Sequence, residues 1–89
     1  MGDVTEILAQ REQQYGDYRD VAKASQEIKK VIRREPNYYD LPNDARESLD
    51  MICSKIARII CGNYENIDHW LDIEGYARLM RNILERKNG

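Results

Sequence analysis

The chain has 89 residues, of which 34% are charged, with a net charge of −2 and a pI near 5.4. This balance gives no general positive field, which disfavours nonspecific binding to a nucleic-acid backbone. No apolar run approaches the ~20 residues that a membrane span needs, so we expect a soluble, cytoplasmic protein with no membrane partner.

The small size bears on assembly and on the two cysteines. A chain of this length buries only about 60–65% of the surface that its unfolded form exposes, so we expect a homodimer, formed through the helical hairpin described below. Cys53 and Cys61 are eight residues apart in one predicted helix, which separates them by about 12 Å. That distance is too long for a disulfide, so both are expected to be buried, reduced thiols.

The first half of the chain predicts two helices joined at the sequence YGDY. The first helix runs from Asp3 to about Gln14, and Gly16 then bends the chain, because glycine accepts backbone angles that other residues resist. The second helix runs from Asp17 to about Arg34 and ends before Pro36. Its apolar residues recur at spacings of three and four, the period of a helix. They are Val21, Ala22, Ala24, Ile28, Val31 and Ile32.

The second half predicts a helical hairpin after a loop at NYYDLP. Its first helix begins with Asn43 as N-cap and stops at Gly62, and its second helix begins with Asp68 as N-cap. No run alternates at the period of two that marks a strand. We therefore predict one all-α domain over residues 1–89, a four-helix bundle-like arrangement with a C-terminal antiparallel hairpin.

Charges lie on this hairpin where apolar residues would be expected. Lys55 and Arg58 are three apart on a helix that is apolar around much of its circumference, and Asp68 and Asp72 lie one turn apart on the next helix. Antiparallel packing would bring the two sets together. They could form an inter-helix salt-bridge cluster, or they could bind a ligand or a hydrated divalent cation.

Further candidates lie outside this cluster. Glu47 and Asp50 form a second acidic pair, either metal ligands or partners of the helix dipole. Trp70 is expected to anchor the core and His69 to be solvated. The YGDY segment could stack on a base, or it could be a bend with packed aromatics. The ligand-binding candidates are Tyr15, Asp17, Lys55, Arg58, Asp72 and Tyr76, and the metal candidates are Glu47, Asp50, Asp68 and Asp72.

Three blocks of the sequence resemble a small family of phage and prophage proteins of uncharacterised function. They are R-x-x-x-YGDY from Arg11, KIARIICGN from Lys55 and D-x-W-x-DI-x-GYARL from Asp68. The resemblance covers nearly the whole chain. It implies an all-helical domain that is encoded by a phage or prophage and acts in the host cytoplasm.

A more distant similarity is to the MazG-type all-α nucleoside triphosphate pyrophosphatases. It implies that Glu47, Asp50, Asp72 and Asp68 hold Mg²⁺ against nucleotide phosphates, with Lys55 or Arg58 touching phosphate. The family pattern pairs E-x-x-E with E-x-x-D, whereas this chain has E-x-x-D at Glu47 and D-x-x-x-D at Asp68. Nucleotide binding without turnover is therefore an alternative to hydrolysis.

Three hypotheses follow. The first is a nucleotide-binding or Mg²⁺-dependent pyrophosphatase-like domain, intact or degenerate. The second is a small phage interaction protein that binds and modulates or inhibits a host defence protein, favoured by the small size, the acidic pI and the lack of a complete catalytic set. The third is a structural oligomeric module in which the charges only set how the helices dock.

Overall fold

A computed structural model describes residues 4–88 of the chain, and every regular element in that range is a helix. The four long helices are α1 (Val4–Tyr15), α2 (Tyr18–Arg33), α4 (Asn43–Cys61) and α5 (Ile67–Asn88), and α3 (Pro36–Asp40) is a short one. The all-α class and the C-terminal hairpin of α4 and α5 are confirmed. Asp3, the predicted start of the first helix, lies outside the described residues.

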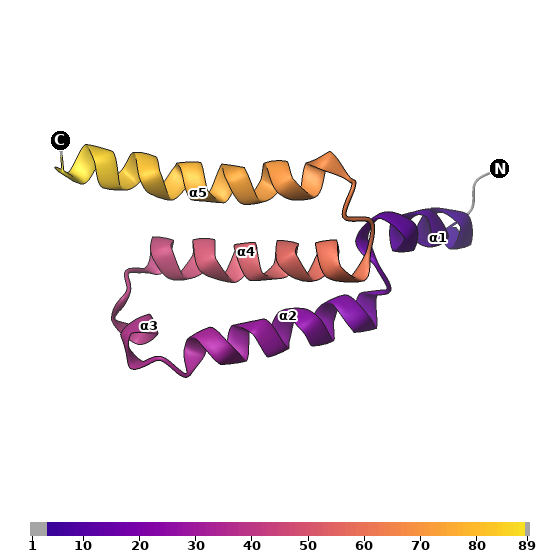
Figure 1. The fold of residues 1–89 in the computed structure, drawn as a ribbon, viewed down its shortest axis with the longest axis horizontal. Helices are drawn as coiled ribbons and strands as arrows, with labels where there is room; N and C mark the ends of the chain where they lie inside the picture. The colour runs from indigo at the N-terminus through magenta and orange to yellow at the C-terminus, as the bar shows by residue number, and fades with distance from the viewer. Residues whose placement is uncertain (1–3, 89) are drawn as a thin grey trace.

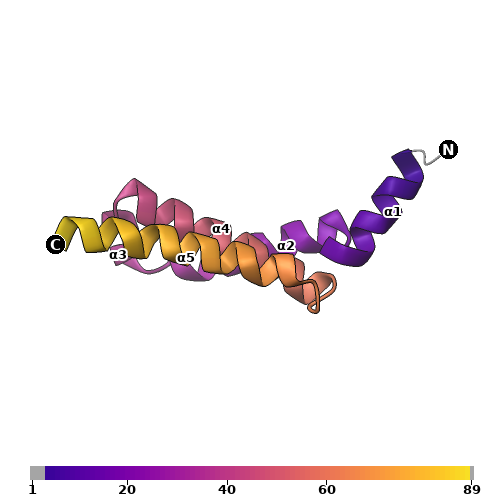
Figure 2. The same cartoon turned by 90° about the horizontal axis from the view of Figure 1, so that it is seen from above.

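The long helices are arranged as an open layer. α4 lies in the middle, and α2 and α5 lie antiparallel to it on either side (Figure 1). α1 extends from one end of the layer and turns away from it, as the view from above shows (Figure 2). The molecule measures 53 × 28 × 20 Å. Helix packs on helix as in a bundle, but only α4 is flanked on two sides.

Helix starts follow local capping chemistry. Asp17, predicted as the start of the second helix, is the N-cap of α2, since its side chain accepts a hydrogen bond from the Arg19 amide at 2.9 Å. For α5 the predicted cap was wrong by two residues: the Asn66 side chain accepts from the Asp68 amide at 3.0 Å, the bond that defines an N-cap. For α4 the prediction was wrong by one, because Pro42 occupies the N-cap position and Asn43 begins the helix.

The segment after α2 was predicted as a loop, but it contains α3. Pro36 is the first residue of this helix, where its fixed φ suits a helix and its missing N–H is not needed. The short helix turns Tyr38 toward α4, and Tyr38 is only 9% exposed. α3 therefore closes one end of the α2–α4 pair.

None of the helices in the described part of the chain combines the length and apolarity that a membrane span requires. Few apolar side chains are buried in the described part of the chain. Among residues 4–88 the buried apolar side chains are Tyr38, Cys53 and Ala57. This small core is a consequence of the layer, which leaves both of its faces open.

Candidate functional site

The bend between α1 and α2 interlocks with the turn between α4 and α5. Gly16 has a φ of +90°, and a Cβ on it would lie 2.8 Å from the backbone and Cβ of Cys61. A Cβ on Gly62 would lie 2.6 Å from the Gln14 carbonyl oxygen. Both glycines are therefore required by close backbone approach, and they bring α1 against the end of α4.

Gln14 fastens this junction. Its backbone carbonyl accepts from the Asn63 amide at 3.2 Å and from Nε2 of His69 at 2.8 Å. Its side-chain oxygen accepts from the Asn66 amide group at 3.2 Å. Because a carbonyl can only accept, Nε2 of His69 carries the hydrogen in this contact. Gln14 thus connects the end of α1 to residues about fifty positions later in the sequence, at the start of α5.

The predictions for His69 and Trp70 were wrong, and the two residues exchange roles. His69 is only 1% exposed, whereas Trp70 is 53% exposed. The periodicity of α5 contains the signal, because His69 shares the spacing of the half-buried residues Ile73, Tyr76 and Met80, and Trp70 lies about 100° away around the helix. The Trp70 indole donates to the Tyr64 carbonyl at 2.8 Å.

A hollow lies beside this junction, and we call it the bend pocket. It has a volume of about 420 Å³. Residues from α1, the bend, α2 and α4 line it, namely Leu8, Arg11, Glu12, Tyr15, Gly16, Tyr18, Val21 and Arg58. Two of the predicted ligand residues, Tyr15 and Arg58, are therefore brought together, and Asp17 lies at the adjoining N-cap.

Two guanidinium groups meet one aromatic ring in this pocket. The Arg11 guanidinium carbon lies 5.1 Å from the centre of the Tyr15 ring, and that of Arg58 lies 5.6 Å from it. The edge of His69 contacts the same ring, with the two ring centres 5.5 Å apart. Within residues 4–88, neither guanidinium forms an ion pair with a carboxylate. Their N–H donors are thus available to an anion.

Arg11 was not among the predicted ligand residues, although its position in the sequence contained a signal. Arg11 precedes Tyr15 by four residues on α1, which places the two side chains on one face of the helix. What the sequence could not show is that Arg58, from the far end of α4, would approach the same ring.

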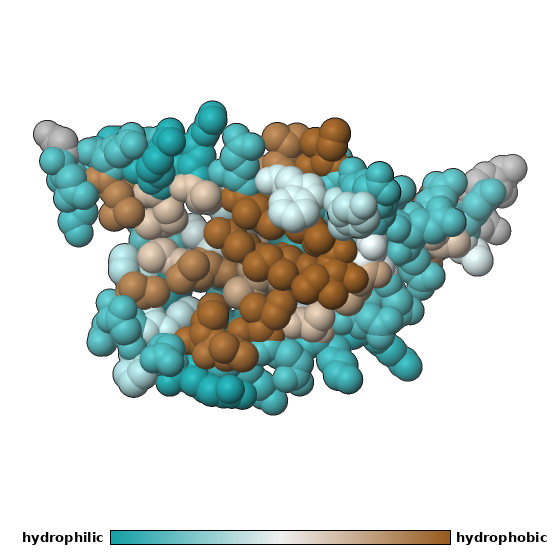
Figure 3. Space-filling view, in the orientation of Figure 1, coloured by the Kyte–Doolittle hydropathy of each residue, from teal (hydrophilic) through white to brown (hydrophobic). Residues whose placement is uncertain are grey.

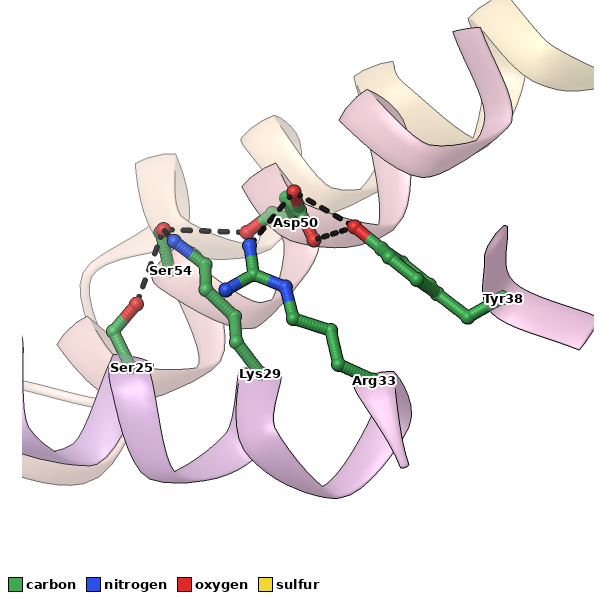
Figure 4. Close-up of polar contacts among 6 residues, drawn as sticks. All are labelled: Ser25, Lys29, Arg33, Tyr38, Asp50 and Ser54. Carbon is green, nitrogen blue, oxygen red and sulfur yellow. Dashed lines mark hydrogen bonds and ion pairs between the residues drawn. The ribbon is translucent and has the colours of Figure 1, made fainter. Parts of the chain in front are cut away.

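A second polar group of residues, which we call the polar seam, joins α4 to α2 and α3 (Figure 4). The Asp50 carboxylate accepts from the Tyr38 hydroxyl at 3.0 Å and pairs with the Arg33 guanidinium at 3.2 Å. One turn along α4, the Ser54 hydroxyl accepts from Lys29 at 3.0 Å and lies 3.3 Å from the Ser25 hydroxyl. The buried polar atoms of this seam are therefore all paired.

The polar seam changes the titration of two groups. The pKa of Arg33 is raised, first by its interaction with the Tyr38 hydroxyl and then by the Asp50 carboxylate. Burial raises the pKa of the Cys53 thiol, and the nearby Asp50 charge acts in the same direction. Both cysteines are free thiols as predicted, and Cys53 is buried, but the burial predicted for Cys61 was wrong, because it lies partly exposed at the end of α4.

Across α4 and α5, the predicted charge pairing is present in part. Lys55 pairs with Asp72 at 3.1 Å, with the lysine side chain 11% exposed and the aspartate 47% exposed. Arg58 does not join them, because it turns to Tyr15. Asp72 and Tyr76 also line an open groove of about 480 Å³ on α5.

The predicted metal ligands lie in separate places. Glu47 and Asp50 line a hollow beside α3, whereas Asp72 lies in the groove on α5 and Asp68 is exposed in the first turn of that helix. In the range 4–88 there is no group of three or more His, Cys, Asp or Glu side chains placed to hold a metal ion. Asp50 already bonds with Arg33 and Tyr38, so this set does not fit a Mg²⁺ site.

In comparisons with known proteins, the chain matches no family model, no curated protein and no solved structure.

Proposed function

We propose that this domain binds a nucleoside phosphate in the bend pocket, in the host cytoplasm if it is phage-encoded. The observation that carries the proposal is the pair of guanidiniums, Arg11 and Arg58, beside the Tyr15 ring. Guanidinium groups bind phosphate oxygens through paired N–H donors, and two of them can share one anion.

The remaining walls of the pocket suit a base and a sugar. Leu8 and Val21 supply apolar surface, and Tyr18 at the rim is 83% exposed, so its ring is free to stack on a base. A volume of about 420 Å³ lies within the usual range for small-molecule sites. The site thus combines a cationic end with an aromatic one.

Binding is better supported than Mg²⁺-dependent hydrolysis. Metal-assisted phosphate chemistry needs carboxylates and phosphates in one site. Here Glu12 is the acid that lines the bend pocket, while Glu47, Asp50 and Asp72 line other hollows. We therefore propose binding without turnover, the degenerate form of the pyrophosphatase-like hypothesis.

Thermal unfolding tests the proposal, with nucleoside mono-, di- and triphosphates added with and without Mg²⁺. A ligand at a hundred times its Kd adds about 2.7 kcal/mol to the free energy of unfolding. For a domain of this size that is a rise in Tm of several degrees or more. We expect the rise without Mg²⁺, and we expect Arg58→Gln to abolish it.

Arg81→Gln is the matched control, because it removes the same charge from an exposed arginine that pairs with Glu85 on α5. It should leave the Tm rise intact. A rise that required Mg²⁺ and was lost in Asp72→Asn would contradict the bend pocket and support a metal site instead.

The alternative is that the chain binds a host protein. The observation in its favour is the number of large apolar side chains left exposed, including Ile60, Ile67 and Leu71. This alternative predicts no Tm rise with any nucleotide and a host protein that is recovered with the wild-type chain.

A further inference from the structure

The chain exposes more surface than a compact protein of its mass. Its accessible surface is 6940 Å², and its mass is 10.5 kDa. A folded monomer of that mass exposes about 5,400 Å², so the excess is about 1,500 Å². The radius of gyration is 15.6 Å, where a compact chain of this length has about 12 Å.

Apolar residues gather on one face of the layer (Figure 3). Along α4, Leu49, Ile56 and Ile60 recur at seven and eleven residues and so form one stripe on that helix. Leu49 is 41% exposed and Ile60 is 69% exposed. The stripe lies on the middle helix, so it is the centre of the face.

The two outer helices continue the face. Trp70, Ala77 and Leu84 recur every seven residues on α5, and Ile28 and Val31 lie three apart on α2. Because α2 and α5 both run antiparallel to α4, the positions that flank their contacts with α4 place these stripes on the same side as Leu49 and Ile60. We call the whole set the apolar face.

The outer edge of α5 is different. Glu74, Arg78, Arg81 and Glu85 form two ion pairs along it, with side chains that are 64–67% exposed. Such a row of charges is typical of a surface in water. Ile67 lies on the same stripe as these residues, seven positions before Glu74.

We propose that a second copy of this chain covers the apolar face, so that two layers form one six-helix bundle around a two-fold axis. Stable homodimers bury at least about 800 Å² per subunit, and obligate ones more. The excess of about 1,500 Å² per chain, to which the projecting α1 also contributes, is large enough to supply such an interface. A single self-complementary patch suits a two-fold dimer. The interface includes α2 and is therefore larger than a pairing through the hairpin of α4 and α5 alone.

Sedimentation equilibrium of the wild-type chain is the first test. We expect twice the chain mass of 10.5 kDa, or about 21 kDa, at micromolar concentration. A mass of one chain, or of more than two, would overturn the proposal. A single-chain mass would leave the apolar face to a different protein.

Trp70, the single tryptophan, locates the interface without a mutation. It is 53% exposed in one chain, so acrylamide should quench it readily unless a second copy covers it. We expect quenching at least several-fold weaker than for free tryptophan. A dimer in which Trp70 is quenched as fully as free tryptophan would show that the copies meet elsewhere.

A matched pair of substitutions completes the test. Ile60→Asp and Ile67→Asp make the same change at two exposed residues. Ile60 is 69% exposed on the apolar face, and Ile67 is 72% exposed on the outer edge of α5. Ile60→Asp should raise the dimer dissociation constant at least a hundredfold or leave the chain unfolded, and Ile67→Asp should keep the wild-type mass. A dimer of unchanged affinity in Ile60→Asp would contradict the proposal.

Discussion

The two sides of α4 hold their neighbours by different means. Toward α2 and α3, the polar seam joins Asp50 to Arg33 and Tyr38, and Ser54 to Lys29 and Ser25. Toward α5, the one ion pair between described residues is Lys55–Asp72, and its aspartate is half exposed. Directional hydrogen bonds fix one register of α2 on α4, whereas α5 depends more on apolar contacts and on the junction at Gln14. Breaking the polar seam should therefore lower the free energy of unfolding more than breaking the Lys55–Asp72 ion pair.

Asp50→Ala should have the largest effect on the free energy of unfolding. It leaves the Tyr38 hydroxyl, on a residue only 9% exposed, and the Arg33 guanidinium without their shared acceptor. An unpaired buried polar group costs about 1–3 kcal/mol. Arg33 is 38% exposed and can turn partly to water, so we expect a total loss of about 2–3 kcal/mol in urea unfolding.

Asp50→Asn is its control, because the amide keeps one acceptor oxygen and loses the charge. It should cost clearly less than Asp50→Ala. Equal stability of wild type and Asp50→Ala would show that the polar seam does not hold α2.

Asp72→Ala should cost less, about 1 kcal/mol or below. The aspartate is 47% exposed, and exposed ion pairs contribute little to stability. If Lys55, Arg58 and Asp72 instead formed a buried cluster, as one hypothesis from the sequence proposed, the loss would be about 3–5 kcal/mol. Urea unfolding of Asp72→Ala and Asp50→Ala compares the ion pair with the polar seam directly. A larger loss of stability in Asp72→Ala than in Asp50→Ala would contradict this ranking.

The two thiols report on the polar seam without changing the energy of the fold. Cys53 is buried beside it and has a raised pKa, whereas Cys61 is partly exposed at the end of α4. A thiol reagent at pH 8 should label Cys61 at least tenfold faster than Cys53, because Cys53 is buried and its raised pKa lowers its own thiolate fraction. The Cys61→Ser variant identifies which thiol remains. Labelling of Cys53 at the rate of Cys61 would mean that the seam opens freely.

The raised pKa also predicts a direction for stability against pH. The folded state retains the Cys53 proton at a pH where the unfolded chain releases it. This contribution is therefore complete below the ordinary thiol value of 9.0 and is lost as pH rises above it. In the Cys53→Ala variant, the free energy of unfolding should therefore fall less between pH 8 and alkaline pH than it does in the wild type.

Much of the fold could be predicted from the sequence, because local signals determine it. Helical periodicity, Pro36, Gly16 and Gly62 placed the four long helices to within a few residues. The contact of Lys55 with Asp72 followed from antiparallel packing of the hairpin. α3 could not be separated from a loop, since five residues are too few to show a period.

The candidate site was harder to predict, because it depends on contacts between distant segments. Arg58 was grouped with Lys55 on spacing alone, but its own position on α4 turns it toward Tyr15 instead. Asp50 was paired with Glu47 as a metal ligand, yet Arg33 and Tyr38 reach it from elements whose placement no local pattern gives. His69 could have been found, because it shares the spacing of Ile73 and Tyr76.

The amide spectrum of the ¹⁵N-labelled protein, recorded while a nucleoside triphosphate is added, tests the central claim most directly. Gly16 lines the bend pocket and Gly75 lines the groove on α5 with Asp72 and Tyr76, so the two glycine amides report on the two competing sites. We expect the Gly16 resonance to shift and saturate while Gly75 stays in place, with the shift lost in Arg58→Gln. A shift of Gly75 alone, or of neither amide, would contradict nucleotide binding in the bend pocket.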